Sequence, residues 1–406
     1  MHTDALITAE PIASHAASRA SQRVESPRVV VAGYGLVTPL GRSAAQTWDG
    51  ICAGSAIDNH ARAVMESRAG EPRVTTLAIA AAREAVAAAG WTRADLPCEA
   101  TAVIVGTSKG PAEIWLTAPP QDMANYPYVA AGRDDVFGLA GVCDAVACGL
   151  GAGSGPRLTL SAACASGLHA LGRAWMMIRS REVERAVVVS AESSLHPLFL
   201  ASFKRLGVLP AEGIGCRPFD QTRDGFLMSE AAAAVCLTAR EVAASHPHSV
   251  EPCIDAPGEV FVDRFALGGD ATHLTGGDPH GRLLRRLIGR VAGDDPIDLV
   301  HAHGTGTITN DPVELEAIDE TVCGIPNVFS HKAALGHSLG AAGLVSIVLN
   351  CLMHERGIIP PNARTARPLR ASHVKIARDA VRRDVRSSIA IAAGFGGPTA
   401  VVRLVS

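Results

Sequence analysis

A cysteine at the junction of a short strand and a helix is the residue in this sequence best placed for covalent chemistry. Leu158 and Leu160 alternate with polar neighbours, which predicts the strand, and Cys164 follows them. Apolar residues then recur at helical spacing, at Leu168, Leu171, Trp175 and Ile178. Unpaired N–H groups at the start of a helix favour a thiolate, lower the cysteine pKa and can bind the oxyanion of a tetrahedral intermediate. The alternative is a small, unreactive core cysteine, which is common in proteins.

Two histidines lie in glycine-rich motifs further along the chain. His303 follows a predicted strand in the segment His-Gly-Thr-Gly-Thr, together with Thr305 and Thr307. His337 lies at the start of an apolar helix, and a third permissive loop, Gly-Phe-Gly-Gly, contains Phe395. A lone histidine is more often a hydrogen-bonded polar residue than a catalyst. One cysteine and two histidines, each at a strand end or a helix start, instead indicate a thiol active site.

Length, charge and composition exclude several classes of protein. The chain has 406 residues and a formal net charge of −3 at pH 7, so it carries neither a basic surface for nucleic acid nor a like-charged tail. No apolar run is long enough to span a bilayer. The ten cysteines form no pairs at metal-ligand spacing. We therefore expect no metal site, no disulfide framework and a cytoplasmic location.

Strands and helices alternate in two successive runs, which predicts an α/β fold in two halves. Residues 1–26 lack periodicity and are expected to form a disordered tail, followed by halves at 27–250 and 251–406. Predicted strands begin at Arg28 and after Glu230, and others lie at 101–106, 158–160, 185–190, 254–262, 297–302, 387–392 and 399–405. Predicted helices lie at 74–89, 281–292 and 312–320, after Cys164 and His337, and between the capping residue Ser43 and Cys52.

Together, these motifs closely resemble those of the β-ketoacyl-acyl carrier protein synthases of the thiolase superfamily, in the elongating group with one cysteine and two histidines. The resemblance runs from Arg28 to Leu404. Its motifs are Ala-Cys164-Ala-Ser-Gly, Arg-Pro-Phe-Asp-x-x-Arg-Asp-Gly-Phe226, His303-Gly-Thr-Gly-Thr307, Asp311-x-x-Glu314, Lys332 with Gly336-His337, and Gly394-Phe-Gly-Gly. The resemblance implies a thiolase-like duplicated α-β-α-β-α five-layer fold that dimerises, with the nucleophile at the foot of a tunnel.

The resemblance also implies a reaction, the decarboxylative Claisen condensation of malonyl-carrier with an acyl group held on a cysteine. Cys164 would take the acyl group from a carrier-protein thioester, and His303 and His337 would donate hydrogen bonds to the malonyl thioester carbonyl. Those bonds stabilise the enolate that forms as carbon dioxide leaves. The N–H groups of Cys164 and Phe395 would form the oxyanion hole, and Phe395 would also be the gate between acylation and condensation.

Other residues match supporting positions of the family. Thr305 and Thr307 match contacts to the 4'-phosphopantetheine arm of acyl carrier protein, which delivers the substrates, so no bound cofactor is expected. The second implied partner is another subunit, either an identical chain or a related ketosynthase or chain-length factor. Lys332 matches a catalytic lysine, and the network expected around it contains Asp311, Glu314 and Ser346. Because a buried lysine needs a partner, we expect its ammonium to bind Asp311, Glu314 or water.

The chain departs from the family pattern at Ser346, where the family has a glutamate that partners the lysine. The motifs around Glu230 and Thr399 also differ. These departures favour a specialised synthase of a discrete polyketide or fatty-acid-like pathway. Two alternatives stay open: a priming acyltransferase or decarboxylase, and a structural partner that resembles a chain-length factor. The complete set of one cysteine and two histidines favours an enzyme.

Overall fold

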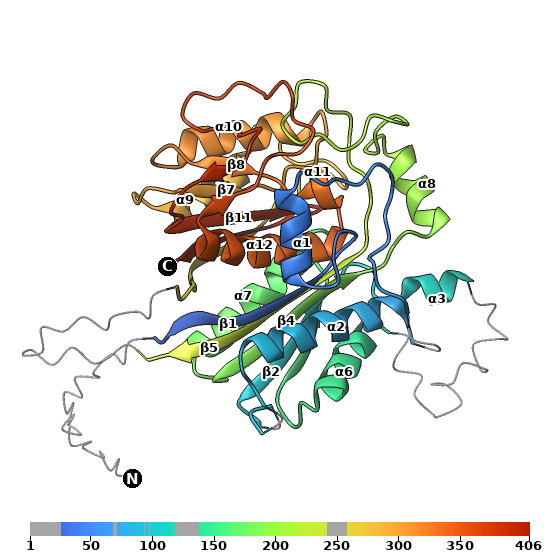
Figure 1. Ribbon diagram of the computed structural model, residues 1–406, viewed down its shortest axis with the longest axis vertical. Coiled ribbons are helices and arrows are strands. Elements are labelled where there is room, and N and C mark those ends of the chain that lie inside the picture. The colour runs from blue at the N-terminus through green and yellow to red at the C-terminus, as the bar shows by residue number, and fades with distance from the viewer. Residues whose placement is uncertain (1–25, 68–70, 93, 97, 118–137, 242–257) are drawn as a thin grey trace, which may run out of the picture.

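The computed structural model describes residues 26–67, 71–92, 94–96, 98–117, 138–241 and 258–406 (Figure 1). The predicted disordered tail over residues 1–26 lies outside these ranges except for its last residue, and so does the predicted boundary at residue 250. Both stay predictions. Within the described ranges, every helix is too short or too polar to cross a membrane.

Ten strands form a sheet in which the second half of the chain repeats the topology of the first. The first five strands lie in the order β3-β2-β4-β5-β1, and the last five lie in the equivalent order β8-β7-β11-β12-β6. The strands of the first half are β1 (Arg28–Val37), β2 (Thr101–Gly106), β3 (Arg157–Leu160), β4 (Arg185–Glu192) and β5 (Ala231–Arg240). Those of the second half are β6 (Phe261–Gly269), β7 (Leu299–His301), β8 (Asn327–Phe329), β11 (Ser387–Ala393) and β12 (Pro398–Val405). This repeat is the duplication expected of the thiolase-like fold.

The two halves join where β1 and β6 run antiparallel, with Val29 opposite Val262 and Val30 opposite Phe261. In each half the three outer strands are parallel: β2 lies between β3 and β4, and β7 lies between β8 and β11. Functional loops in such sheets lie beyond the carboxyl ends of the parallel strands. Cys164, His303 and His337 follow β3, β7 and β8, and Phe395 follows the neighbouring strand β11.

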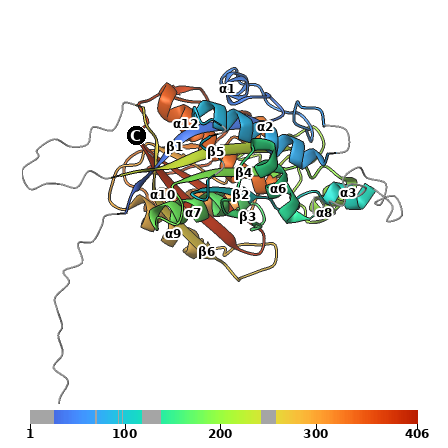
Figure 2. The same ribbon diagram turned by 90° about the horizontal axis from the view of Figure 1, so that it is seen from below.

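Helices complete the five layers (Figures 1 and 2). Helices α2 (Arg73–Ala88) and α6 (Leu139–Leu150) cover one outer face, and α9 (Arg282–Ala292) with α10 (Asn310–Thr321) covers the other. Helix α7 (Ser166–Arg179) contacts β2 and β4 as well as β12, and helix α12 (Ala342–Arg356) contacts β5 as well as β11. Both therefore lie between the two halves of the sheet. The predicted α-β-α-β-α layering is confirmed.

Two glycines allow α7 and α12 to pack closely. A Cβ on Gly167 would lie 3.0 Å from a backbone nitrogen of α12, and a Cβ on Gly343 would lie 2.8 Å from a leucine side chain of α7. Cys164 lies just before α7, and His337 lies just before the short η2 (Leu339–Ala341) that leads into α12. Close packing of the two helices therefore brings the starts of both helices, and the residues in front of them, together.

The remaining elements are mostly short. Helix α1 (Ala44–Cys52) begins after Ser43, whose side chain accepts a hydrogen bond from the Gln46 N–H, as the capping motif predicts. Helix α3 (Ala112–Thr117) follows the loop after β2. The sequence did not predict α6, β8, α8 (Pro197–Arg205), α11 (Lys332–Leu335), β9 (Ile358–Ile359) or β10 (Val381–Arg382).

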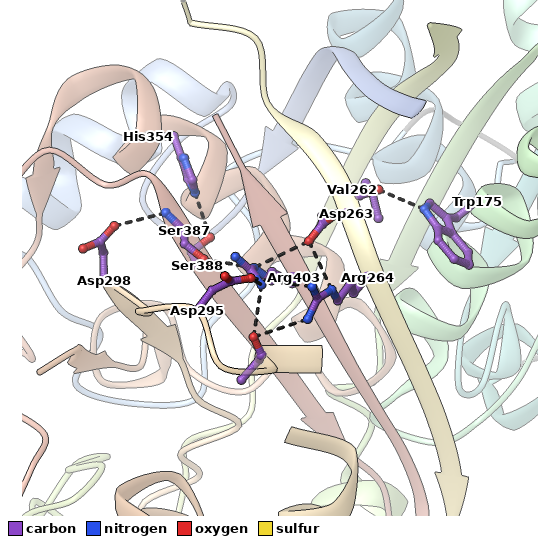
Figure 3. A network of polar contacts seen from close by, with 11 residues as sticks. Trp175, Val262, Asp263, Arg264, Asp295, Asp298, His354, Ser387, Ser388 and Arg403 are labelled. Atoms are coloured by element: carbon purple, nitrogen blue, oxygen red, sulfur yellow. Dashed lines mark hydrogen bonds and ion pairs between the residues drawn. The ribbon is translucent and has the colours of Figure 1, made fainter. Parts of the chain in front are cut away.

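One strand lies elsewhere than predicted, because charged residues hide its apolar pattern. Residues 254–257 of the strand predicted near 254–262 lie outside the described ranges, and within them β6 begins only at Phe261 and continues to Gly269. Asp263 and Arg264 interrupt the pattern, but both belong to a cluster of ion pairs around Arg403 of β12 (Figure 3). A guanidinium nitrogen of Arg403 lies 2.7 Å from a carboxylate oxygen of Asp295 and another lies 3.6 Å from Asp263. Paired charges of this kind are tolerated in a partly buried strand.

Candidate active site

Cys164 lies on a sharp turn between β3 and α7, as the sequence predicts, and its side chain is buried. Ala163, immediately before it, has a φ of 49°, in the left-handed region that residues other than glycine rarely adopt. Within the described ranges, the N–H groups of Cys164 and Phe395 donate to no other residue. Gly394 lies against the Cys164 amide, because an added Cβ would be 3.1 Å from that nitrogen. The turn therefore leaves two backbone donors available beside the thiol.

The Cys164 thiol is not activated in the way the sequence predicted. Burial raises its pKa to about 11, although the charges of Lys109 and Lys332 act in the opposite direction. The expectation that the helix start lowers the pKa is therefore wrong, because the loss of water around the sulfur outweighs the favourable charges. Burial therefore favours the neutral thiol over the thiolate in this site.

The rings of His303 and His337 lie side by side. Their centroids are 5.4 Å apart and their planes are inclined by 81°. Both side chains are buried, and burial together with the charge of Lys332 holds both pKa values well below the usual histidine range. The edge of the Phe226 ring packs on His337, with centroids 4.9 Å apart, and His337 Nδ1 has no hydrogen-bond partner in the described structure. Two neutral imidazoles, each able to donate one hydrogen bond, therefore converge next to Cys164.

Asp311 and Glu314, both buried on α10, bind the backbone of the glycine-rich loop rather than a cation. Glu314 accepts hydrogen bonds from the N–H groups of His303 and Gly304 at 2.6 and 2.7 Å. Asp311 accepts from the Gly306 N–H at 3.1 Å. Burial raises the pKa of Asp311 to about 6 and that of Glu314 to about 7. The two acids thus position the loop that carries His303.

Lys332 is buried at the start of α11 and donates a hydrogen bond to the backbone carbonyl of His303. No carboxylate of the described residues lies within 4 Å of its ammonium, so the predicted bond from Lys332 to Asp311 or Glu314 is wrong. Asp311 and Glu314 accept hydrogen bonds from N–H groups of the loop, whereas Lys332 donates to the carbonyl oxygen of His303, whose N–H donates to Glu314. Burial lowers the Lys332 pKa to about 8, and the charge of Glu314 opposes that shift.

A cavity of about 440 Å³ joins these groups. Cys164, His303 and His337 line it, as do Thr305, Thr307 and Phe395. The hydroxyl oxygens of Thr305 and Thr307 are 3.0 Å apart, and Thr307 also accepts from the Asn310 N–H at 3.2 Å. Among the described residues, no group of three or more His, Cys, Asp or Glu side chains is arranged to hold a metal ion.

Family comparisons agree with this arrangement. The model of the β-ketoacyl synthase N-terminal domain matches residues 71–243, and the model of the C-terminal domain matches residues 264–366. The chain belongs to the β-ketoacyl synthase family. Members of this family are condensing enzymes of the acyltransferase type. The predicted family and class of enzyme are thereby confirmed.

Individual relatives of this ketosynthase include polyketide and fatty-acid enzymes. It is 29% identical to the tetracenomycin polyketide synthase ketoacyl synthase alpha subunit of Streptomyces glaucescens, over 91% of this chain and 95% of that one. It is 28% identical to 3-oxoacyl-[acyl-carrier-protein] synthase 2 of Rhizobium meliloti, over 92% and 97%. Among solved structures, the ishigamide ketosynthase/chain length factor matches with a TM-score of 0.78 and 26% identity, over 94% of this chain and 99% of that one.

Sequence reasoning missed a second pair of histidines in this ketosynthase. His301 Nε2 lies 2.8 Å from His331 Nδ1, and His301 Nδ1 lies 2.7 Å from the side-chain oxygen of Asn350. All three side chains are buried. His301 lies two residues before His303, and His331 directly precedes Lys332, so both were visible in the motifs as extra histidines. What the sequence did not reveal is that they contact each other.

Ser346, the position where a glutamate is usual, belongs to the same neighbourhood. Its hydroxyl donates to the Ala342 carbonyl at 3.2 Å and lies 3.5 Å from His331 Nδ1. It makes no hydrogen bond to Lys332. The position of the usual glutamate is therefore taken by a neutral hydroxyl that contacts His331 and not Lys332.

Phe395 is the end of a row of aromatic rings that leads to the histidine pair. Its ring centroid is 6.1 Å from that of Phe203, which in turn is 5.8 Å from that of Phe226. Phe226 packs against His337, as described above. Phe395 is half-buried and lies on the loop after β11, next to Gly396 and Gly397, which have φ values of 82° and 96°. Glycine adopts positive φ values readily, so the backbone next to the Phe395 ring can take a conformation that other residues rarely adopt.

Proposed function

We propose that this ketosynthase catalyses the decarboxylative Claisen condensation of malonyl-carrier with an acyl group held on Cys164, in a discrete polyketide or fatty-acid-like pathway. The observation that carries the proposal is the pair of neutral imidazoles of His303 and His337, with ring centroids 5.4 Å apart, lining the same cavity as the cysteine. Two neutral donors suit a developing enolate, because they stabilise negative charge without themselves being buried cations.

Acylation is the first step. Cys164 Sγ attacks the thioester carbonyl of the acyl-carrier substrate, and the resulting oxyanion accepts hydrogen bonds from the N–H groups of Cys164 and Phe395. The bond between the acyl carbon and the carrier sulfur then breaks, and the carrier thiol leaves with the proton that Cys164 gave up. A pKa of about 11 means that this proton is lost together with the attack, because the free thiolate is scarce at neutral pH.

Condensation follows with the malonyl substrate. His303 and His337 donate to its thioester carbonyl, the bond to the carboxylate breaks, and the electron pair is held as the enolate while carbon dioxide leaves. The enolate carbon attacks the acyl-cysteine carbonyl, and the tetrahedral intermediate uses the same two N–H groups. When it collapses, the thiolate of Cys164 leaves and takes up one proton. The cycle therefore consumes one proton for each new carbon–carbon bond.

Substrate delivery completes the proposal. Thr305 and Thr307 present hydroxyl groups in the cavity, which supports a role in binding the 4'-phosphopantetheine arm of an acyl carrier protein. Strand β3, which leads to Cys164, has one neighbour in the sheet and is only partly buried, as expected for a strand covered by a second subunit. That subunit is an identical chain or a related ketosynthase or chain-length factor. A reducing cytoplasm is the expected compartment, on the cysteine pattern described above.

The decisive experiment is reconstitution with an acyl-carrier and malonyl-carrier protein, followed by mass spectrometry of Cys164 and of the carrier-bound product. We expect an acyl adduct on Cys164 and a β-ketoacyl product. Cys164→Ala should lose both, whereas Cys236→Ala, a buried cysteine of β5, should lose neither. A Cys164 adduct without a β-ketoacyl product would instead support the priming acyltransferase, and the absence of both would support the structural partner.

A further inference from the structure

A lysine outside the predicted site packs on the hydrophobic cluster that contains Cys164 and Phe203. Lys109 is on the loop after β2, and its side chain is half-buried. Its ammonium lies 5.2 Å from the ring centroid of Phe199 and 5.6 Å from that of Phe203, both on α8. The chain has only four lysines, and two of them, Lys109 and Lys332, influence the Cys164 thiol through their charge.

The Lys109 ammonium is held by a hydroxyl group rather than by a carboxylate. Its Nζ donates to Ser108 Oγ at 3.2 Å, and that hydroxyl donates onward to Glu192 Oε2 at 2.6 Å. Glu192 is fully buried and also accepts from the Ser108 N–H and the Ser194 hydroxyl. No described carboxylate lies within 4 Å of the Lys109 ammonium itself. A lysine has three donors, so two of its N–H groups are left for a ligand or solvent.

The surroundings of this cation are otherwise apolar. Cys164 and Phe203 belong to one buried hydrophobic cluster, against which Phe199 and Phe395 pack. An acyl group attached to Cys164 is therefore bordered by this cluster, and the Lys109 ammonium lies over two of its aromatic rings, those of Phe199 and Phe203. A saturated chain that covered the ammonium would remove water from a charge without replacing the lost hydrogen bonds, which is unfavourable.

We propose that Lys109 is a specificity-determining residue, which binds a carbonyl or carboxylate oxygen of the acyl group on Cys164 and so favours oxygenated acyl chains over purely hydrocarbon ones. The inference rests on the proposed function, because it needs Cys164 to carry an acyl group. A charge-assisted hydrogen bond to such an oxygen corresponds to roughly 10- to 100-fold in rate or affinity. The cation–π contacts with Phe199 and Phe203 and the bond to Ser108 keep the ammonium in position.

The test compares acyl groups of equal length. Hexanoyl, 3-oxohexanoyl and 5-oxohexanoyl thioesters of N-acetylcysteamine are offered to the full-length enzyme, and the rate of adduct formation on Cys164 is followed by intact-protein mass spectrometry. The quantity of interest is the ratio of each oxo rate to the hexanoyl rate. Comparing this ratio between variants cancels the different intrinsic reactivities of the thioesters.

We expect Lys109→Met to lower at least one oxo-to-hexanoyl ratio by roughly tenfold or more relative to the wild type. Lys109→Arg should keep most of the preference, because it retains a cation, and Lys375→Met, an exposed lysine beyond β8, should leave the ratio unchanged. Thermal unfolding of each variant, followed by circular dichroism, shows whether the fold is intact.

Three results would overturn the inference. If Lys109→Met slows all three thioesters equally, Lys109 acts on the thiol and not on the acyl group. If all three rates are unchanged, it does neither. If the wild type forms no adduct on Cys164 with any thioester, the proposed function has failed and the inference falls with it. The first two outcomes leave the proposed function standing, so the two failures are distinguishable.

Discussion

Lys332 and Glu314 bind opposite ends of the same residue without forming an ion pair with each other within 4 Å. The Lys332 ammonium donates to the His303 carbonyl, and Glu314 accepts from the His303 N–H at 2.6 Å. The backbone of His303 is therefore fixed on both sides by ionisable groups. Because burial moves the pKa of Glu314 up to about 7 and that of Lys332 down to about 8, both groups change charge close to neutral pH.

We expect the condensation rate to depend on pH as a narrow bell with apparent pKa values of about 7 and 8. Below the first value Glu314 is protonated and binds the His303 and Gly304 amides less well, and above the second Lys332 loses its charge-assisted bond. Initial rates of malonyl decarboxylation measure the profile. Glu314→Gln should remove the acid limb, and Lys332→Met should remove the alkaline limb. A profile that keeps both limbs in both variants would show that other groups titrate.

Lys332 should also make the free energy of unfolding of the protein depend on pH. Its folded-state pKa of about 8 is below the ~10.4 of a lysine in an unfolded chain, so between these values the unfolded chain binds more protons and stability rises with pH. From pH ~7.5 to ~9.5 the wild type should therefore gain about 1 to 2 kcal/mol in free energy of unfolding relative to Lys332→Met. Urea denaturation at both pH values measures this gain. The same comparison of the wild type with Lys375→Met, at an exposed lysine, should give no such gain. A difference between wild type and Lys332→Met that stays constant with pH would contradict the shift.

The cysteine and both histidines could be predicted from the sequence because each lies where two local patterns meet. Cys164 separates a period-two segment from a helical one, and His337 precedes an apolar helix. Such junctions are defined by residues only a few positions away in the chain, so they can be recognised from the sequence alone. The division into two α/β halves could be anticipated for the same reason, since strands and helices alternate in two runs along the chain, whereas the duplicated layering was implied by the family resemblance.

Partners that are distant in the sequence could not be predicted. A rule of charge pairing assigned Lys332 to an acid, but positive φ values at Gly304 and Gly306 turn loop amides toward α10, and these amides occupy both acids. The approach of Lys109 to Phe199 joins positions 90 residues apart, and no local pattern indicates it. The prediction placed strand β6 too early in the sequence because Asp263 and Arg264 form ion pairs with distant residues, Arg403 and Asp295, which no local pattern indicates.

His303 and His337 should matter more for condensation than for acylation. Each is expected to donate one hydrogen bond to the enolate, and loss of one such donor costs on the order of 100- to 1000-fold in rate. His337→Ala and His303→Ala should therefore slow malonyl decarboxylation by that factor, while adduct formation on Cys164 falls much less. His373→Ala, an exposed histidine, is the control. Normal condensation by His337→Ala would refute the assignment of a cysteine with two histidines.

The hydrogen bond between His301 and His331 joins the strand that leads to His303 with the loop that carries Lys332. The Asn350 amide nitrogen donates to Ser388 Oγ, so its oxygen faces His301, and His301 Nδ1 is the donor. His301 Nε2 is then an acceptor and His331 Nδ1 donates to it, which requires the His301 ring to be neutral. Burial also holds the pKa of His331 well below the usual histidine range. Ser388 in turn lies 2.8 Å from His354, at the edge of the cluster in Figure 3.

Replacing His331 with leucine should leave the buried His301 acceptor unpaired and lower the free energy of unfolding by about 1 to 3 kcal/mol. The His301→Leu variant should lose a similar amount. The double variant should lose clearly less than the sum of the two single losses. With both histidines replaced, only the Asn350 side-chain oxygen is left without its hydrogen-bond partner. Since the bond ties the loop of His303 to that of Lys332, His331→Leu should also slow malonyl decarboxylation more than acylation of Cys164. Urea denaturation of the four proteins gives the coupling energy. Additive losses, or half-reactions slowed equally, would mean that the bond contributes neither to stability nor to the placement of His303.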